Sequence, residues 1–207
     1  SVIVGDTRRL ARAGFLLKKF PVIDIEENPD FFEPTGERPS EMLIDEDDPA
    51  LILFTSGTTG KSKGALLSHR SLIGFVDGTI HNGYEKKLIA LKVLDIDPST
   101  LPSTQEIVLA TSPLFHISGL PAGVLMNMAN GAKIIFRSGR FDPADVLRLI
   151  EEEKITNWTA IGDMGPRVMT HNDFQTRDTS SLTRVSSGGA HLSENMKQLI
   201  RLYNLNL

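Results

Sequence analysis

The sequence predicts an α/β fold in which a mostly parallel sheet is flanked by helices. Two observations carry this prediction. Short apolar runs alternate with helical patterns along most of the chain, and several helical patterns begin and end with capping residues. Strands separated by helices pair in parallel through right-handed crossovers, and ligands then bind at the carboxyl ends of the strands. The length of 207 residues and the apolar share of 40% fit one α/β domain or a piece of a larger one.

The expected strands are short apolar runs bounded by turn residues. The run at 50–54 is typical of a buried strand, because all five of its residues are apolar. Trp158 is most simply explained as a core residue of its strand. The full set of expected strands is 2–4, 21–25, 50–54, 65–68, 106–111, 132–137, 157–161 and 182–186.

The expected helices have recognisable starts and stops. One begins at Asp6 or Thr7 and continues to about Lys19. The clearest start is Asp142 followed by Pro143, which are typical of an N-cap and a first helical position. Further helices are expected at 71–81, at 120–130 with Gly131 as the stop, and after Ser193.

Two stretches do not fit the strand–helix alternation. Residues 26–49 contain four prolines and ten acidic residues, and we expect an exposed connector. Residues 82–105 are polar and contain Pro98 and Pro102. We expect an irregular surface loop or insertion there, with at most a turn or two of helix at 86–94.

Charge and composition exclude several classes of protein. The net charge of −4 argues against a dedicated binder of nucleic acid or anionic membranes. Ten acidic residues and one arginine lie between Glu26 and Asp48, so the rest of the chain carries +5, which suits an anionic ligand. The absence of cysteine excludes disulfides, thiol nucleophiles and cysteine-based metal sites. No apolar run reaches the roughly 18 residues of a membrane span, no secretory signal is visible, and we expect a cytoplasmic protein.

The loop from Thr55 to Gly64 is the most informative stretch. It contains three glycines, five hydroxyl side chains and two lysines directly after an expected strand. Glycines let successive backbone N–H groups converge on one point, while hydroxyls and lysines add donors and positive charge. A polyphosphate needs this combination. We expect contacts to phosphate from Thr55, Ser56, Gly57, Thr58, Thr59, Gly60, Lys63 and Gly64.

A Walker A loop is the first alternative for this stretch. Gly60-Lys61-Ser62 matches the end of that pattern, but Thr55 stands where its first glycine belongs. A Walker A loop also runs directly into a helix at its lysine. Here Gly64 interrupts, and the following residues are typical of a strand. A kinase or NTPase of this type is therefore disfavoured, and a helix beginning at Lys61 would restore it.

The whole loop resembles the phosphate-binding signature of the adenylate-forming superfamily, which includes acyl-CoA synthetases, adenylation domains and luciferases. The usual pattern is T-S-G-[ST]-T-G-x-P-K-G, and this chain departs from it once, with Ser62 in place of Pro. The resemblance implies an ATP-binding enzyme and gives Lys63 and Thr55 the role of catalytic residues. It also implies that the 207 residues form a single incomplete domain, a central fragment of the large N-terminal domain.

Two further segments are similar to the family in order and spacing. Residues 113–119 resemble its P-L-F-H-x-x-G segment, which implies a substrate role for His116 and Phe115. Residues 187–190 resemble its S-G-G-A segment, which implies adenosine contacts from Gly188, Gly189 and Ala190 and an acyl contact from Gly189. Two weaker matches are Arg140, which can meet CoA but is more simply a solvated charge, and Asp163 or Met164 beside the acyl pocket.

The resemblance implies ATP-dependent activation of a carboxylic acid, in our expectation a fatty acid, to an acyl adenylate and then to acyl-CoA. The substrates would be ATP, the acid and CoA, with Mg²⁺ as cofactor. Its main ligand and the later family motifs lie outside these residues, so we expect no metal site here and no turnover by this chain alone. Exposed cut surfaces would then favour association. A non-catalytic nucleotide-binding fragment is the second alternative.

Overall fold

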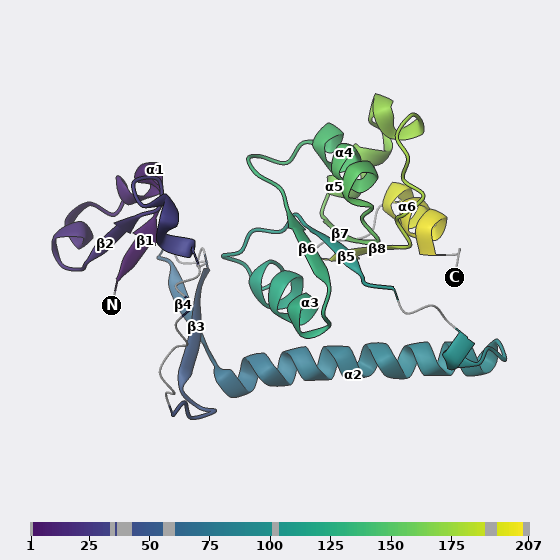
Figure 1. Ribbon diagram of the computed structural model, residues 1–207, viewed down its shortest axis with the longest axis horizontal. Coiled ribbons are helices and arrows are strands. Elements are labelled where there is room, and N and C mark those ends of the chain that lie inside the picture. Colours follow the sequence, from purple (N-terminus) through teal and green to yellow (C-terminus); the bar gives the residue numbers. More distant parts are fainter. Residues whose placement is uncertain are drawn as a thin grey trace. The chain divides into compact units, whose positions relative to one another are not determined.

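The computed structural model describes residues 2–33, 36, 43–55, 61–100, 104–188 and 194–204. The chain divides into two compact units, Ser1–Leu43 and Ile44–Leu207 (Figure 1). The division falls within the acidic stretch that the sequence predicts as a connector.

The first unit is built on two short parallel strands, β1 (Ile3–Gly5) and β2 (Val22–Asp24). Asp6 caps helix α1 (Thr7–Leu10) as predicted, because its carboxylate accepts a hydrogen bond from the Arg9 backbone N–H at 2.7 Å. The prediction of one helix to about Lys19 is wrong. Gly14 has a φ of +51°, which an α-helix does not allow, and the 3₁₀ helices η1 (Gly14–Lys18) and η2 (Pro29–Phe32) follow.

The second unit contains a four-stranded parallel sheet, which confirms the predicted fold class. Its strands lie in the order β6 (Lys133–Phe136), β5 (Ile107–Ala110), β7 (Asn157–Ile161) and β8 (Arg184–Gly188). The chain passes from β5 outward to β6 and then returns to the other side of β5. The carboxyl ends of β5 and β7 therefore form the point at which the winding of the sheet reverses.

One face of this sheet is packed by α4 (Pro143–Glu153), α5 (Met164–Met169) and α6 (Glu194–Asn204) (Figure 1). Asp142 caps α4 as predicted, and its carboxylate accepts a hydrogen bond from the Ala144 N–H at 3.0 Å. Ser193, the expected cap of α6, lies outside the described residues. The buried core consists of Leu109, Val146, Leu147, Leu149, Ile150, Ile155, Trp158, Ala160, Val168, Leu182, Val185 and Met196.

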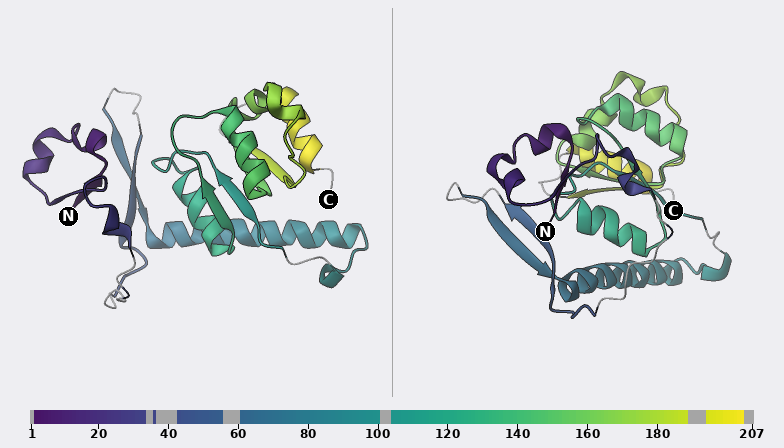
Figure 2. Two further views of the ribbon diagram at one scale, coloured as in Figure 1. Left: turned by 45° about the horizontal axis from the view of Figure 1, so that its top comes forward. Right: turned by 60° about the vertical axis from the view of Figure 1, so that its left-hand side comes forward.

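The other side of the sheet carries the π-helical segment η4 (Leu120–Leu125) and helix α3 (Met126–Ala129), with α2 (His69–Val93) packed against both. Figure 2 shows α3 on the side of the sheet opposite to α4. The short helices η3 (Pro98–Thr100) and η5 (Asn172–Gln175) complete the described elements.

Helix α2 corrects the expectation of an irregular stretch at 82–105. The helix predicted at 71–81 continues to Val93, because no proline occurs before Pro98 and one glycine, Gly83, does not stop a helix. It ends where Asp95 adopts a φ of +54° and the Ile96 N–H donates to the Leu91 carbonyl, as in a Schellman motif.

The hairpin of β3 (Pro49–Thr55) and β4 (Lys63–Ser68) is antiparallel and precedes α2. The prediction of a buried strand here is wrong, since Ile52 is 54% and Phe54 70% exposed. The hairpin has only two strands, and among the described residues no helix covers the face that carries these two side chains.

Candidate functional site

The predicted phosphate loop connects the two strands of the hairpin. Thr55 at the end of β3 pairs with Lys63 at the start of β4, and the Thr55 hydroxyl donates a hydrogen bond to the Lys63 carbonyl at 3.4 Å. Lys61 and Lys63 are exposed, and neither forms an ion pair with a described residue. Gly64 lies so close to Ile52 that a Cβ on it would be 2.8 Å from the Ile52 Cγ2. Residues 56–60 lie outside the described part of the chain.

The hairpin excludes the Walker A alternative. After Lys61 the chain becomes extended as β4, and the next helix begins at His69. A Walker A lysine lies instead at the start of a helix. The loop is therefore a strand–loop–strand element, as the expected strand at 65–68 implied.

The His116 turn follows the carboxyl end of β5 and is held by its own backbone. The His116 N–H donates to the Pro113 carbonyl at 3.0 Å, and the Gly119 N–H donates to the His116 carbonyl at 2.9 Å. A Cβ on Gly119 would lie 2.0 Å from the Pro113 carbonyl oxygen. The turn therefore requires glycine at this position.

The turn continues into the π-helical segment η4. The Ala122 N–H donates to the Ile117 carbonyl at 3.1 Å, five residues back. The buried side chain of Asn127 stabilises this wide turn, since its Nδ2 donates to the carbonyls of Gly123 at 2.9 Å and Ala122 at 3.4 Å.

The ring of His116 is oriented by Ser118. Its Nδ1 accepts a hydrogen bond from the Ser118 backbone N–H at 3.2 Å and lies 2.9 Å from the Ser118 hydroxyl oxygen. A backbone N–H can only donate, so the neutral ring carries its proton on Nε2. His116 can therefore offer an Nε2–H to an acceptor such as a carboxylate oxygen.

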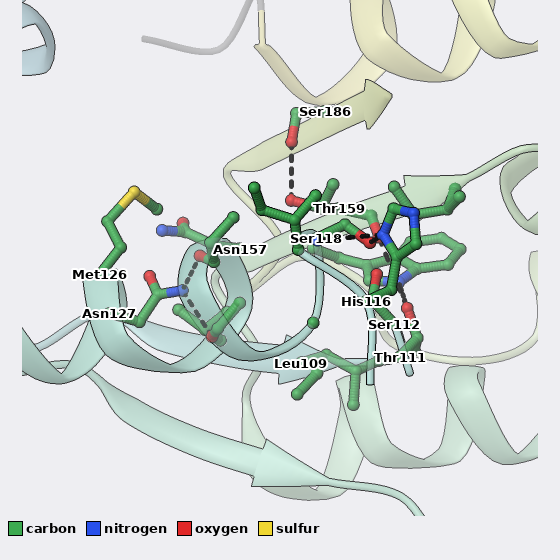
Figure 3. A pocket seen from close by; sticks show the side chains of 18 of the residues that line it. Leu109, Thr111, Ser112, His116, Ser118, Met126, Asn127, Asn157, Thr159 and Ser186 are labelled. Atoms are coloured by element: carbon green, nitrogen blue, oxygen red, sulfur yellow. Dashed lines mark hydrogen bonds between the residues drawn. The ribbon is translucent and has the colours of Figure 1, made fainter. Parts of the chain in front are cut away.

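A cavity of about 480 Å³ lies between this turn and the face of the sheet opposite the core (Figure 3). It opens beside the carboxyl ends of β5 and β7, where ligands bind in sheets of this type. Its polar lining comes from the His116 turn, from α3 and from alternate positions of the strands: Thr111, Ser112, His116, Ser118, Asn127, Asn157, Thr159, Arg184 and Ser186.

A comparison with known families shows the family to which the chain belongs. Residues 7–204 match the family model described as AMP-binding enzyme. The chain belongs to this family. The adenylate-forming resemblance of the sequence is thereby confirmed.

The curated relatives of this AMP-binding chain include several CoA ligases. It is 34% identical over 172 residues to 4-coumarate–CoA ligase-like 6 of Arabidopsis thaliana, covering 81% of this chain and 28% of the relative. It is 29% identical over 158 residues to feruloyl-CoA synthase of an Amycolatopsis species, covering 76% and 28%. It is 31% identical over 197 residues to peroxisomal OPC-8:0-CoA ligase 1 of Arabidopsis, covering 94% and 30%. The chain thus spans less than a third of the length of these relatives.

Solved structures agree on the fold. O-succinylbenzoate coenzyme A synthetase from Bacillus subtilis, in complex with AMP, aligns with 98% of this chain and 37% of its own, with a TM-score of 0.66 and 21% identity. The luciferase-like enzyme of the mealworm Zophobas morio aligns with 98% of this chain and 45% of its own, with a TM-score of 0.68 and 20% identity.

The predicted residues of this AMP-binding chain do not all lie together. His116 lines the cavity, whereas Phe115 is 76% exposed and does not line it. Gly188 ends β8 and pairs with Ile161, while Gly189 and Ala190 lie outside the described residues. The remaining contacts expected of these residues stay predictions.

The two weakest expectations of the sequence receive no support from the cavity. Met164 packs against the apolar core, and Asp163 is exposed near Arg167, so neither lines the cavity. The element around Arg140 is held by another arginine. The nearly buried Arg137 donates to Asp145 at 3.1 Å and to the Arg140 carbonyl at 2.6 Å. Hydrogen bonds from Arg148 and Arg137 hold the pKa of Asp145 below its usual range.

Sequence reasoning missed the polar residues on the open face of the sheet. Asn157 and Thr159 on β7, with Arg184 and Ser186 on β8, line the cavity. Their signal was available: in N-W-T-A-I the polar residues alternate with Trp158 and Ala160, which is the period of a strand with two different faces.

Within the described ranges, no group of three or more histidine, aspartate or glutamate side chains could hold a metal ion. In the same ranges, no helix has the length and apolar character to cross a membrane.

Proposed function

We propose that the whole protein activates a carboxylic acid with ATP and then joins it to CoA. A carboxylate oxygen of the acid attacks the α-phosphorus of ATP, the bond to the bridging oxygen of the β-phosphate breaks, and pyrophosphate leaves. The CoA thiolate then attacks the acyl carbonyl, and AMP leaves. The observation that carries this proposal is the strand–loop–strand element Thr55–Gly64 in a chain of the AMP-binding family.

The chain's own residues would align the reactants and neutralise charge, because the first step needs no protein nucleophile. We assign Lys63 and the hydroxyls of the loop, Thr55 among them, to the β- and γ-phosphates. The Nε2–H of His116 would bind the carboxylate of the acid. Gly188, Gly189 and Ala190 would contact the adenosine, and Mg²⁺ would supply further positive charge from ligands beyond these residues.

The names of the relatives bear on which kind of acid is the substrate. A fatty acid was expected from the family resemblance, but two of the relatives above are named for 4-coumarate and feruloyl groups. We therefore propose an acid with an aromatic or otherwise compact body in place of a plain fatty acid. A cavity of about 480 Å³ falls within the ordinary range for a small-molecule site.

We also propose that these 207 residues bind ATP without turning it over, since they span about 28% of relatives that carry out such activities. Exposed apolar side chains such as Phe54 and Ile89 would favour association in solution. A cytoplasmic location fits the sequence and also stays a proposal.

The test is ATP binding, measured by displacement of a fluorescent ATP analogue, for the chain and for Lys63→Ala. We expect affinity to fall about tenfold or more, because a charge-assisted contact to phosphate is lost. Lys87→Ala, an exposed lysine on α2, is the matched control and should leave binding unchanged. Equal affinity in all three proteins would contradict the proposal. Pyrophosphate release by the chain alone would contradict only its expected inactivity.

A further inference from the structure

The inner part of the cavity contains a buried amide that the proposed chemistry does not use. Asn157 begins β7 and is 9% exposed. Within the described residues its side chain makes no hydrogen bond, although its neighbours Thr156 and Trp158 each donate one. Among the described residues, every fully buried side-chain nitrogen or oxygen has a hydrogen-bond partner. The Asn157 amide has none among these residues, so its polar atoms are not fully buried. The amide therefore faces the cavity that it lines.

A buried amide without a partner is unusual, since most such groups are hydrogen-bonded. Asn127 provides the contrast within the same cavity. Its Nδ2 is engaged by the carbonyls of Gly123 and Ala122, so its role in the fold is evident. Asn157 makes no comparable hydrogen bond within the part of the chain that the structure describes, and Asn is not a residue that strands favour. The amide is thus available to a bound molecule.

The position of Asn157 sets which part of the ligand it would meet. The cavity is lined along β7 from Asn157 to Ile161, and it is lined by the His116 turn as well. These four steps along a strand cover about 13 Å. Figure 3 shows His116 and Asn157 on opposite sides of the cavity. An acid whose carboxylate lies at His116 would therefore bring its far end to Asn157.

The charge around Asn157 indicates a neutral group at that far end. Arg184 pairs with Asn157 in the strand register and also lines the cavity. Its guanidinium is 3.2 Å from a Glu106 carboxylate oxygen, so its charge is already balanced. A second carboxylate would meet an occupied arginine and the nearby Glu106. A hydroxyl can both donate to and accept from an amide without adding charge.

We propose that Asn157 is a specificity-determining residue, and that it selects acids bearing a neutral hydroxyl at the end opposite the carboxylate. This inference rests on the proposed function, in which His116 holds the carboxylate. A rigid acid with an aromatic ring and a hydroxyl opposite its carboxylate arm satisfies the length and the polarity together.

The test uses Trp158, the single tryptophan of the chain, which packs in the core between the cavity-lining residues Asn157 and Thr159 of β7. Its fluorescence is titrated with 4-hydroxycinnamate, with cinnamate and with 4-carboxycinnamate. We expect the hydroxylated acid to bind about tenfold more tightly than cinnamate, the usual size of one net hydrogen bond. The dicarboxylate should bind no better than cinnamate.

Variants then assign the preference to the amide. Asn157→Leu should abolish the preference by weakening only the hydroxylated acid, and Asn157→Thr, which keeps a hydroxyl on a good strand former, should retain part of it. Asn82→Leu, the same substitution at an exposed position of α2 away from the cavity, is the matched control, and its ratio of the two affinities should stay that of the wild type. Far-UV circular dichroism shows which variants are folded.

Two outcomes would overturn the inference: equal affinity of the wild type for 4-hydroxycinnamate and cinnamate, or an unchanged preference in folded Asn157→Leu. ATP binding is measured on the same preparations. Loss of that binding alone would count against the proposed function, whereas intact ATP binding without hydroxyl preference would count against the role of Asn157.

Discussion

The two faces of the parallel sheet differ sharply, although the same strands supply both. On β7, Trp158 and Ala160 are 1% and 0% exposed and pack under the helices of the core face. Asn157 and Thr159, which alternate with them, line the cavity on the other face. β8 repeats the pattern, with Val185 in the core and Ser186 beside the cavity.

The five residues of β7 therefore serve two purposes, one on each face of the sheet. The core face is apolar and close-packed, so its side chains stabilise the fold. The cavity face of β7 and β8 carries the polar side chains of Asn157, Thr159 and Ser186, which are not members of this apolar core. The Thr159 and Ser186 hydroxyl oxygens lie 2.9 Å apart at the exposed surface, where such a pair adds little stability.

The largest expected effect comes from the core face. Trp158→Ala should lower the free energy of unfolding by about 3–5 kcal/mol, because it leaves a large cavity and removes the Nε1 hydrogen bond to Thr111. Thr159→Ala, one residue along and on the other face, should cost about 1 kcal/mol or less. Urea unfolding followed by circular dichroism measures both. Similar losses of unfolding free energy in the two variants would contradict the difference between the core face and the cavity face.

A backbone substitution beside the cavity should have an intermediate effect. Gly119→Ala would place a Cβ against the Pro113 carbonyl, so the His116 turn must shift. We expect a loss of about 1–3 kcal/mol in unfolding free energy, together with weakened acid binding. Gly78→Ala is the matched control. Its site in α2 has open space, and the helix should gain about 0.5–1 kcal/mol. A Gly119→Ala protein as stable as the wild type would contradict the packing of this turn.

The smallest expected effect is a dependence of stability on acid pH at the rim of the core face. Hydrogen bonds from the Ser180 hydroxyl and backbone and from Lys154 hold the pKa of Asp178 well below its usual range. The Asp178 backbone N–H and Arg177 likewise lower the pKa of Glu151. A carboxyl whose pKa is lowered by folding stabilises the protein fully above its unfolded pKa. That contribution is lost as the pH falls through the folded pKa.

The unfolding free energy should therefore decline as the pH falls below about 4, and decline less steeply in Asp178→Asn. Denaturant unfolding at a series of pH values between 2 and 6 measures the slope. An identical slope in the variant would show that these hydrogen bonds do not stabilise the fold.

Sequence alone predicted the parts of the fold that depend on local signals. The Asp142 cap, the alternation of strands with helices and the core position of Trp158 could all be predicted from neighbouring residues. The length of α2 was not, because Pro98 and Pro102 dominate the pattern of 82–105, although residues 85–92 are mostly good helix formers. The exposure of Ile52 and Phe54 depends on what covers the hairpin, which no local pattern encodes.

The residues of the candidate site also differ in how well the sequence predicts them. The glycine-rich loop and the His116 turn were found because their chemistry is contiguous in the sequence. The alternation in N-W-T-A-I indicates that Asn157 lies on the face away from Trp158, but what that face meets depends on long-range packing. Only the approach of η4 and α3 to the sheet turns a strand amide into the lining of a cavity.

The most direct measurement of the division between the two faces is the thermal unfolding midpoint of the wild type and of Asn157→Leu, with and without 4-hydroxycinnamate. A ligand that binds only the folded protein raises the midpoint. We expect similar midpoints for the two proteins alone, and a ligand-induced rise that is present in the wild type and largely lost in the variant. An equal rise in both proteins would contradict a role for the open face of β7 in binding the acid.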